Sequence, residues 1–146
     1  MQKVRVASSV EDINMTVLAV RHIVASKAVA ERIISLDAEW DTRTNRSGQV
    51  VASFKTALIQ IGYQDFESRI SALLWQVFWH QRLSRALLAL FTEPHIHFVG
   101  VCISGDLKRI GKDFKCTECI ESTNCLNLAR KSRKKEGCGT EWYSVT

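Results

Sequence analysis

The chain has 146 residues, 46% of them hydrophobic, with one proline and seven glycines. This length and composition predict one domain with a sizeable core and exclude a disordered or low-complexity chain. The net charge is +5, and residues 74–146 carry most of the excess, with eleven basic and seven acidic side chains. A basic half favours an anionic partner such as nucleic acid, although surface charge that serves only solubility gives the same pattern.

The N-terminal residues and the cysteines bear on the cellular compartment. Residues 1–6 lack the apolar stretch of a signal peptide, and no segment reaches the roughly 18 apolar residues of a membrane span. The five cysteines are an odd number, which favours free thiols in a reducing compartment. We therefore expect an intracellular protein, nuclear or cytoplasmic, with no membrane partner.

The first half of the chain predicts one helix and several strands. Residues 4–7 predict a short strand, and Ser9 predicts the N-cap of an amphipathic helix from Val10 to about Ile33. Residues 33–40 predict the first long strand, which a polar loop follows. Further β-rich segments are predicted at 50–54, 57–63 and 69–75.

The second half continues the alternation of helices and strands. Leucine and alanine at helical spacing predict a helix over 81–91, which a proline closes. Residues 97–102 predict a further core strand, and a helix is expected from Leu107 to about Phe114. Residues 124–135 predict a last helix with a thin apolar face. This order of elements predicts an α/β domain around a mixed sheet.

Two carboxylates end the first long strand. Asp37 and Glu39 follow an apolar run at spacing i, i+2. On an extended strand this spacing puts both side chains on one face, where their like charges repel. A hard divalent cation held by oxygen ligands would offset the repulsion, whereas a solvated strand end with incidental acids is the structural alternative.

A third acid, Asp106, follows the strand predicted at 97–102 and opens the next helix. Side chains at the carboxyl ends of neighbouring strands converge at one edge of an α/β sheet. If the two strands are neighbours, Asp106 meets Asp37 and Glu39 at one point. Such a cluster suits two divalent cations about 3.5–4 Å apart, which activate a water and stabilise the leaving oxygen in phosphodiester cleavage.

Three segments carry a resemblance to a known family. Residues 36–40, Leu-Asp-Ala-Glu-Trp, resemble the first motif of the DEDD (DnaQ-like) 3′–5′ exonucleases, and residues 56–61 resemble their second strand. Residues 98–107, with Asp113 and Phe114, resemble the second motif. The resemblance spans about residues 4–114 and is strongest to the Werner-syndrome-type exonuclease domain.

The resemblance implies a ribonuclease-H-like α/β fold, with a mixed five-stranded sheet flanked by helices. It implies that Asp37, Glu39 and Asp106 are catalytic and bind two Mg²⁺ or Mn²⁺ ions. It also implies that Leu36 and Trp40 bind the terminal nucleotide. The implied activity is hydrolysis of terminal phosphodiester bonds at a single-stranded 3′ end of DNA or RNA, as in DNA repair or RNA processing.

The third motif of the family has no counterpart in this sequence. In the family a helix supplies a fourth aspartate, and a tyrosine or histidine four residues earlier positions the attacking water. No aspartate follows Asp113 here, and only three residues follow Tyr143. The sequence thus predicts that the C-terminal helix of this motif is absent, in a truncated chain or a degenerate copy.

This departure leaves three hypotheses for function. Loss of a metal ligand and of the water-positioning group lowers rates by orders of magnitude, so activity of this chain alone is in doubt. A protein partner or a missing C-terminal portion could complete an active exonuclease. A catalytically impaired relative would instead bind nucleic acid or protein, and a strand-joining transferase on the same fold is the third hypothesis.

Residues 116–146 differ in character from the exonuclease-like residues 1–115, and we assign them to the incomplete end of the same domain. A zinc site could be formed by four cysteines, at positions Cys116, Cys119, Cys125 and Cys138. Their spacing lacks a paired second C-x-x-C, which favours free thiols. The basic run 130–135 could contact phosphates, act as a nuclear import signal or form a solvated helix face.

The other aromatic and thiol side chains are expected to be structural. Trp75, Phe78 and Trp79 are expected to pack in the core or at its rim rather than to stack on bases. Cys102 is expected in the core. Cys119 is expected on a short strand.

Overall fold

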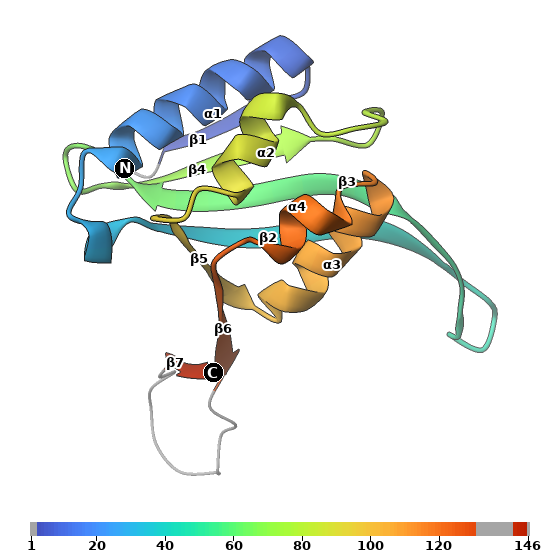
Figure 1. The fold of residues 1–146 in the computed structure, drawn as a ribbon. Coiled ribbons are helices and arrows are strands. Elements are labelled where there is room, and N and C mark those ends of the chain that lie inside the picture. Colours follow the sequence, from blue (N-terminus) through green and yellow to red (C-terminus); the bar gives the residue numbers. More distant parts are fainter. Residues whose placement is uncertain (1–2, 131–141, 146) are drawn as a thin grey trace.

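The computed structural model describes residues 3–130 and 142–145. These residues form one mixed sheet in the order β1-β4-β3-β2-β5-β6-β7 (Figure 1). In chain order the strands are β1 (Lys3–Ala7), β2 (Ile33–Thr44), β3 (Val50–Gln64), β4 (Ile70–Gln76), β5 (His97–Val101), β6 (Cys125–Arg130) and β7 (Trp142–Val145). The helices are α1 (Val10–Ala25), the 3₁₀ turn η1 (Val29–Glu31), α2 (Arg85–Phe91), α3 (Ile103–Asp113) and α4 (Thr117–Glu121).

Five strands of the sheet point in the same direction. β1, β4, β2, β5 and β6 are parallel, whereas β3 runs antiparallel between β4 and β2 and β7 runs antiparallel to β6. The carboxyl ends of the five parallel strands therefore lie at one edge. The predicted mixed sheet is confirmed, but the prediction of five strands is wrong, because the described residues form seven.

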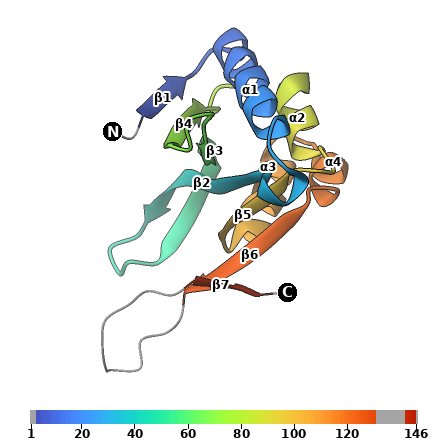
Figure 2. The ribbon, with the colours of Figure 1, turned by 90° about the vertical axis from the view of Figure 1, so that its left-hand side faces the viewer.

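Successive side chains along each strand point to opposite faces of the sheet. Helices pack on one face, called here the covered face, and the other is the open face. Figure 2 shows the four α-helices gathered on one side of the sheet. The covered face packs against them through buried residues, among them Ile34, Leu36, Ala38, Ile59, Ile61, Leu73, Trp75 and Phe98. The open face carries the alternate residues, among them Ile33, Asp37, Glu39, Ile70, Leu74, Val99, Val101 and Leu128. One core thus lies between the helices and the covered face.

The first helix is shorter than its apolar spacing predicts. α1 begins at Val10 with the Ser9 N-cap, as expected, but ends at Ala25 instead of about Ile33. The Ser26 hydroxyl donates a 2.6 Å hydrogen bond to the Ile23 carbonyl. Such a local bond competes with helix continuation. The η1 turn then leads into β2.

Further boundaries differ from the sequence prediction. β2 continues to Thr44, through part of the predicted loop, rather than ending at residue 40. β3 runs through both predicted β-rich segments as one strand, with a register shift where Ala57 has no partner in β2. α2 begins at Arg85 rather than Gln81, because Ser84 is the N-cap that accepts from the Leu87 N–H. α3 begins at Ile103 rather than Leu107.

The helix predicted over 124–135 is wrong where the structure describes it, because β6 occupies residues 125–130. Leu126 and Leu128 have the period of two of a strand, and they pair in register with Val99 and Val101 of β5. The remainder, residues 131–135, lies outside the described residues. Cys119 lies on α4 rather than on the expected strand.

The aromatic side chains that were expected to be structural differ in how far they are buried. Trp75 is fully buried, as predicted, and its indole N–H donates a 2.8 Å hydrogen bond to the Thr16 hydroxyl. Phe78 and Trp79 are exposed, which contradicts their predicted packing. Cys102 is also exposed rather than in the core. No helix in the described ranges combines the length and apolar character needed to cross a membrane.

Candidate functional site

β2 divides its side chains between the core and the candidate site. Leu36 and Ala38 are buried on the covered face, whereas Asp37 and Glu39, which alternate with them, are exposed on the open face. This is the arrangement that the i, i+2 spacing predicts. The same short stretch therefore anchors the centre of the sheet and presents two carboxylates.

Asp37 and Glu39 lie where β2 and β5 separate. The strands pair over only three residue pairs, from Ile33 with His97 to Ser35 with Val99. Gly100 follows, and a Cβ atom added there would clash with the Leu36 carbonyl oxygen. Only glycine permits this close approach of the two backbones. The crevice beyond Gly100 opens at the carboxyl edge of the sheet, where ligand sites of α/β folds gather.

A tight connection brings α3 to this crevice. Cys102, at the N-cap of α3, has the left-handed φ of 56°, which is uncommon for a residue with a side chain. The Ser104 N–H donates a 3.1 Å hydrogen bond to the Asn127 side-chain oxygen of β6. A side chain 23 residues away therefore caps the first turn of α3, in place of a cap from Cys102.

Asp106 in that first turn joins the acids of β2. The Ala38 N–H donates a 3.0 Å hydrogen bond to the Asp37 Oδ1 atom, and the Asp106 carboxyl group lies beside this pair. Asp106 is only 8% exposed. Burial, the Asp37 carboxylate and the charge of Glu39 together raise the pKa of Asp106 to about 6, and the Ala38 N–H opposes them. The structure thus places Asp106 beside Asp37, whereas the described residues do not gather all three acids at one point as the sequence argument expected.

Glu39 lies on the same face beside Gln60. The Gln60 amide donates a long hydrogen bond of 3.5 Å to the Glu39 Oε1 atom. Across the residues that the structure describes, no three His, Cys, Asp or Glu side chains are close enough to hold a metal ion. The donor set still fits one, because the buried Asp106 beside the exposed Asp37, with Glu39 on the same face, offers hard oxygen ligands whose repulsion a divalent cation would offset.

One face of α3 attaches the acid site to β3. Asp113 lies two turns after Asp106 on that face, and its Oδ2 atom accepts 2.7 Å hydrogen bonds from both the N–H and the hydroxyl of Thr56. Thr56 adjoins the unpaired Ala57, and its own side chain is fully buried. The Asp113 carboxylate therefore satisfies polar groups next to the irregularity of the strand, and it fixes the position of α3.

Arg109 is a functional neighbour that the sequence did not single out. Its guanidinium group lies 4.1 Å from the centre of the Trp40 ring and 3.5 Å from the Asp113 carboxylate. It also donates to the Ser53 hydroxyl, at 2.7 Å, and to the Phe54 carbonyl. Helical spacing of Asp106, Arg109 and Asp113 at i, i+3 and i+7 was the one signal that could have revealed this shared face.

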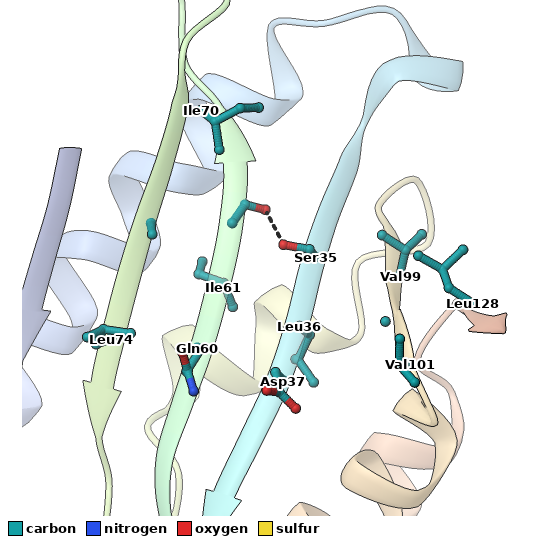
Figure 3. Close-up of a pocket in the computed structure, with 13 residues that line it drawn as sticks. Ser35, Leu36, Asp37, Gln60, Ile61, Ile70, Leu74, Val99, Val101 and Leu128 are labelled. Carbon is teal, nitrogen blue, oxygen red and sulfur yellow. Dashed lines mark hydrogen bonds between the residues drawn. The ribbon is translucent and has the colours of Figure 1, made fainter. Parts of the chain in front are cut away.

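The open face forms a groove of about 510 Å³ that leads to the acids (Figure 3). Asp37 and Gln60 lie near one end, and Ser35 and Ile70 lie towards the other. Aliphatic side chains make up most of its lining. The Asp37 carboxylate therefore lies at one end of an open, mostly apolar groove.

The other residues predicted for the site have structural neighbours of their own. Leu36 is buried in the core, and Trp40 is half-buried beneath Arg109, so their predicted nucleotide contacts stay predictions. Cys116, Cys119 and Cys125 carry free thiols, and Cys138 lies outside the described residues. The preference for free thiols over zinc likewise stays a prediction.

Comparison with known proteins gives structural neighbours only. No family model matches the chain, and no curated protein matches it. The EXD2 exonuclease domain matches with a TM-score of 0.60 and 19% identity, over 86% of this chain and 56% of that one. The same domain soaked in Mg matches with a TM-score of 0.59 and 18% identity, over the same shares of the two chains.

A second neighbour comes from Trypanosoma brucei. Its RNase D in complex with RNA matches with a TM-score of 0.60 and 15% identity, over 86% of this chain and 37% of that one. The chain thus spans just over half of the EXD2 domain and about a third of the RNase D. Together with the sheet order and the position of α3, these matches show that the chain has the ribonuclease-H-like α/β fold of exonuclease domains.

Proposed function

We propose that this chain is a DEDD-type 3′–5′ exonuclease domain, of the Werner-syndrome type, which hydrolyses terminal phosphodiester bonds of single-stranded nucleic acid. The observation that carries the proposal is the buried Asp106 carboxyl group against Asp37, at the carboxyl edge of the sheet. A bare fold gains nothing from burying one carboxylate beside another, because desolvation and repulsion both oppose it. Such pairs are typical of functional sites.

Asp37, Glu39 and Asp106 would hold Mg²⁺ or Mn²⁺ in this proposal. A bound pair of these ions supplies an activated water and stabilises the leaving oxygen. Other groups of the chain have a holding role: the Ala38 N–H orients the Asp37 carboxylate, and Asp113 and Arg109 keep α3 against β2 and β3. The fold that this chain shares with an exonuclease domain soaked in Mg and with an RNA-bound RNase D supports this reading.

A catalytically impaired relative that binds nucleic acid or a protein is the second candidate. The observation in its favour is that residues 114–146 include no aspartate, so these residues offer no fourth aspartate of the DEDD set. Nucleic-acid binding would persist after the loss of catalysis, because the predicted nucleotide contacts, Leu36 and Trp40, are not the metal-binding acids.

The test is end degradation of 5′-labelled single-stranded DNA and RNA with Mg²⁺ or Mn²⁺. The exonuclease proposal predicts stepwise shortening from the 3′ end, which Asp37→Asn and Asp106→Asn each reduce by about a hundredfold or more. Asp41→Asn, an exposed acid further along β2, is the matched control and keeps activity. No shortening with binding retained would overturn the exonuclease proposal and favour the impaired relative.

A further inference from the structure

Two large aromatic side chains project into solvent from the turn between β4 and α2. Trp79 is 65% exposed and Phe78 is 51% exposed. Their rings meet edge to face with centroids 6.0 Å apart. Adjacent exposed aromatic rings of this size are costly to hydrate and commonly mark a binding surface.

The exposure is imposed by the backbone of the turn. Val77 is buried, and its N–H donates a 2.9 Å hydrogen bond to the Ala57 carbonyl of β3. The His80 N–H closes the turn onto the Val77 carbonyl at 3.0 Å. The His80 ring lies 2.7 Å from the Ser8 carbonyl oxygen, and Lys55 donates to the His80 carbonyl. Both ends of the turn are therefore held, and the two residues at its tip face outward.

The turn lies at the same edge of the sheet as the candidate acid site. Glu39 pairs with Leu58, which in turn pairs with Gln76, the last residue of β4. Two strand spacings separate Glu39 from Gln76, or about 10 Å. Figure 1 shows the loop after β4 on the same side of the molecule as α3 and the β2–β3 hairpin. A single strand with its end at the acids could therefore reach the turn within a few nucleotides.

The charge around the turn complements a polyanion. Residues 77–92 contain Arg82 and Arg85 and no acidic residue, and both arginines are exposed. A shallow hollow of about 530 Å³ lies beside the turn, with Trp79 and Arg82 in its lining. Residues 8–10 line the opposite side of this hollow. The acids that follow them in sequence are Glu11 and Asp12, in the first turn of α1. Phosphates are thus favoured on the arginine side of the rings.

We propose that Phe78 and Trp79 form a base-stacking platform for single-stranded nucleic acid, with Arg82 as its phosphate contact. This inference rests on the proposed function, since it concerns the strand that leads to the acid site. Stacking on aromatic rings accepts any base, and cationic side chains follow the backbone. The platform would therefore select a single strand over a duplex, whose bases are already stacked, without selecting a sequence.

The test measures binding in EDTA, so that no end degradation interferes. Single-stranded DNA and RNA of equal length are titrated against the chain, and tryptophan fluorescence and anisotropy of a labelled oligonucleotide are recorded. We expect Trp79→Ala and Phe78→Ala each to weaken binding about tenfold. Trp79→Phe should retain most of the affinity because it keeps an aromatic ring.

A matched control tests whether any exposed aromatic would serve. Phe66 is 62% exposed but lies in the turn that joins β3 to β4, at the opposite end of those strands. Phe66→Ala should leave binding unchanged. Arg82→Glu should weaken binding at low salt and lose its effect at high salt, because the phosphate contact is electrostatic.

The result also separates this inference from the exonuclease proposal. If the chain binds single strands through Trp79 but degrades no ends, the platform proposal is supported and the exonuclease proposal is rejected. Binding unchanged by Trp79→Ala and Phe78→Ala would overturn the platform, even in an active enzyme. Equal affinity for single strands and blunt duplexes, or stronger binding to anionic lipid vesicles than to single strands, would overturn it too.

Discussion

The two faces of the sheet are built from the same strands but have different roles. On the covered face, aliphatic and aromatic side chains pack against α1 to α4 and are almost fully buried. On the open face, the alternate residues are half-exposed aliphatics together with Asp37 and Glu39. β2 contributes to both, with Leu36 and Ala38 in the core and the two acids outside. The side chains that stabilise the core and the acids of the candidate site therefore lie on opposite faces of the same strand, rather than in distant parts of the molecule.

The largest expected effect comes from damage to the covered face. Phe98→Ala removes a fully buried ring that packs 5.5 Å from the Phe91 ring. We expect a loss of about 3–5 kcal/mol in the free energy of unfolding, because a cavity replaces packed core atoms. Denaturant titration measures it. A loss below about 1 kcal/mol would show that the covered face does not dominate stability.

The next effect concerns the attachment of α3 to the sheet. Asp113→Ala leaves the buried N–H and hydroxyl of Thr56 without acceptors. We expect a loss of about 2 kcal/mol in unfolding free energy, since unpaired buried donors are expensive. Asp113→Asn keeps an acceptor oxygen and should lose less. Equal losses for the two variants would contradict the hydrogen-bond explanation.

The third effect has the opposite sign and tests the acid pair. The pKa of Asp106 is about 6 in the folded chain and 3.8 for the free side chain, so the folded state binds the proton more tightly. Stability must then fall as pH rises from about 4 to 6, and it stays low above that range. Asp106→Asn removes this penalty.

We expect Asp106→Asn to stabilise the metal-free chain by about 1–2 kcal/mol at pH 8, after allowance for solvent screening, and not at pH 3.5. Unfolding in EDTA at the two pH values measures the difference. A gain that is equal at both pH values would show that packing, and not charge, is responsible.

The smallest effect is expected on the open face away from the acids. Ile70 is 56% exposed at the start of β4. Ile70→Thr keeps a β-branched side chain, so unfolding free energy should change by less than about 0.5 kcal/mol. Binding of a hydrophobic dye should fall, because the groove loses apolar surface. A destabilisation comparable with that of Phe98→Ala would remove the distinction between the two faces.

The sequence was sufficient for features that depend on local alternation or spacing. Alternation in residues 34–39 predicted both the core positions of β2 and the shared face of Asp37 and Glu39. The meeting of Asp106 with Asp37 followed from the position of each acid at the end of a buried strand. The exonuclease-like order of motifs gave the fold class, which the structural neighbours support.

Features that depend on distant partners could not be predicted. Thr56 needs Asp113 because Ala57 interrupts the strand pairing, and nothing local announces that interruption. Asn127 caps α3 from another strand. The helix predicted over 124–135 is wrong because Leu126 and Leu128 fit a thin helical face as well as a strand. Only their pairing with β5 distinguishes the two. Phe78 and Trp79 are large apolar residues that directly follow a buried strand, so the sequence favoured packing over exposure for both.

The short pairing between β2 and β5 has a consequence for how the chain folds. β2 and β3 are joined by a tight turn at Asn45–Gly48 and pair extensively, so this hairpin closes a short loop. The pairing of Ile33 with His97 closes a loop of more than sixty residues, which is slower. We therefore expect refolding to restore β-sheet circular dichroism before Asp106 reaches Asp37. A stalled chain would have its strands without the Asp37–Asp106 pair.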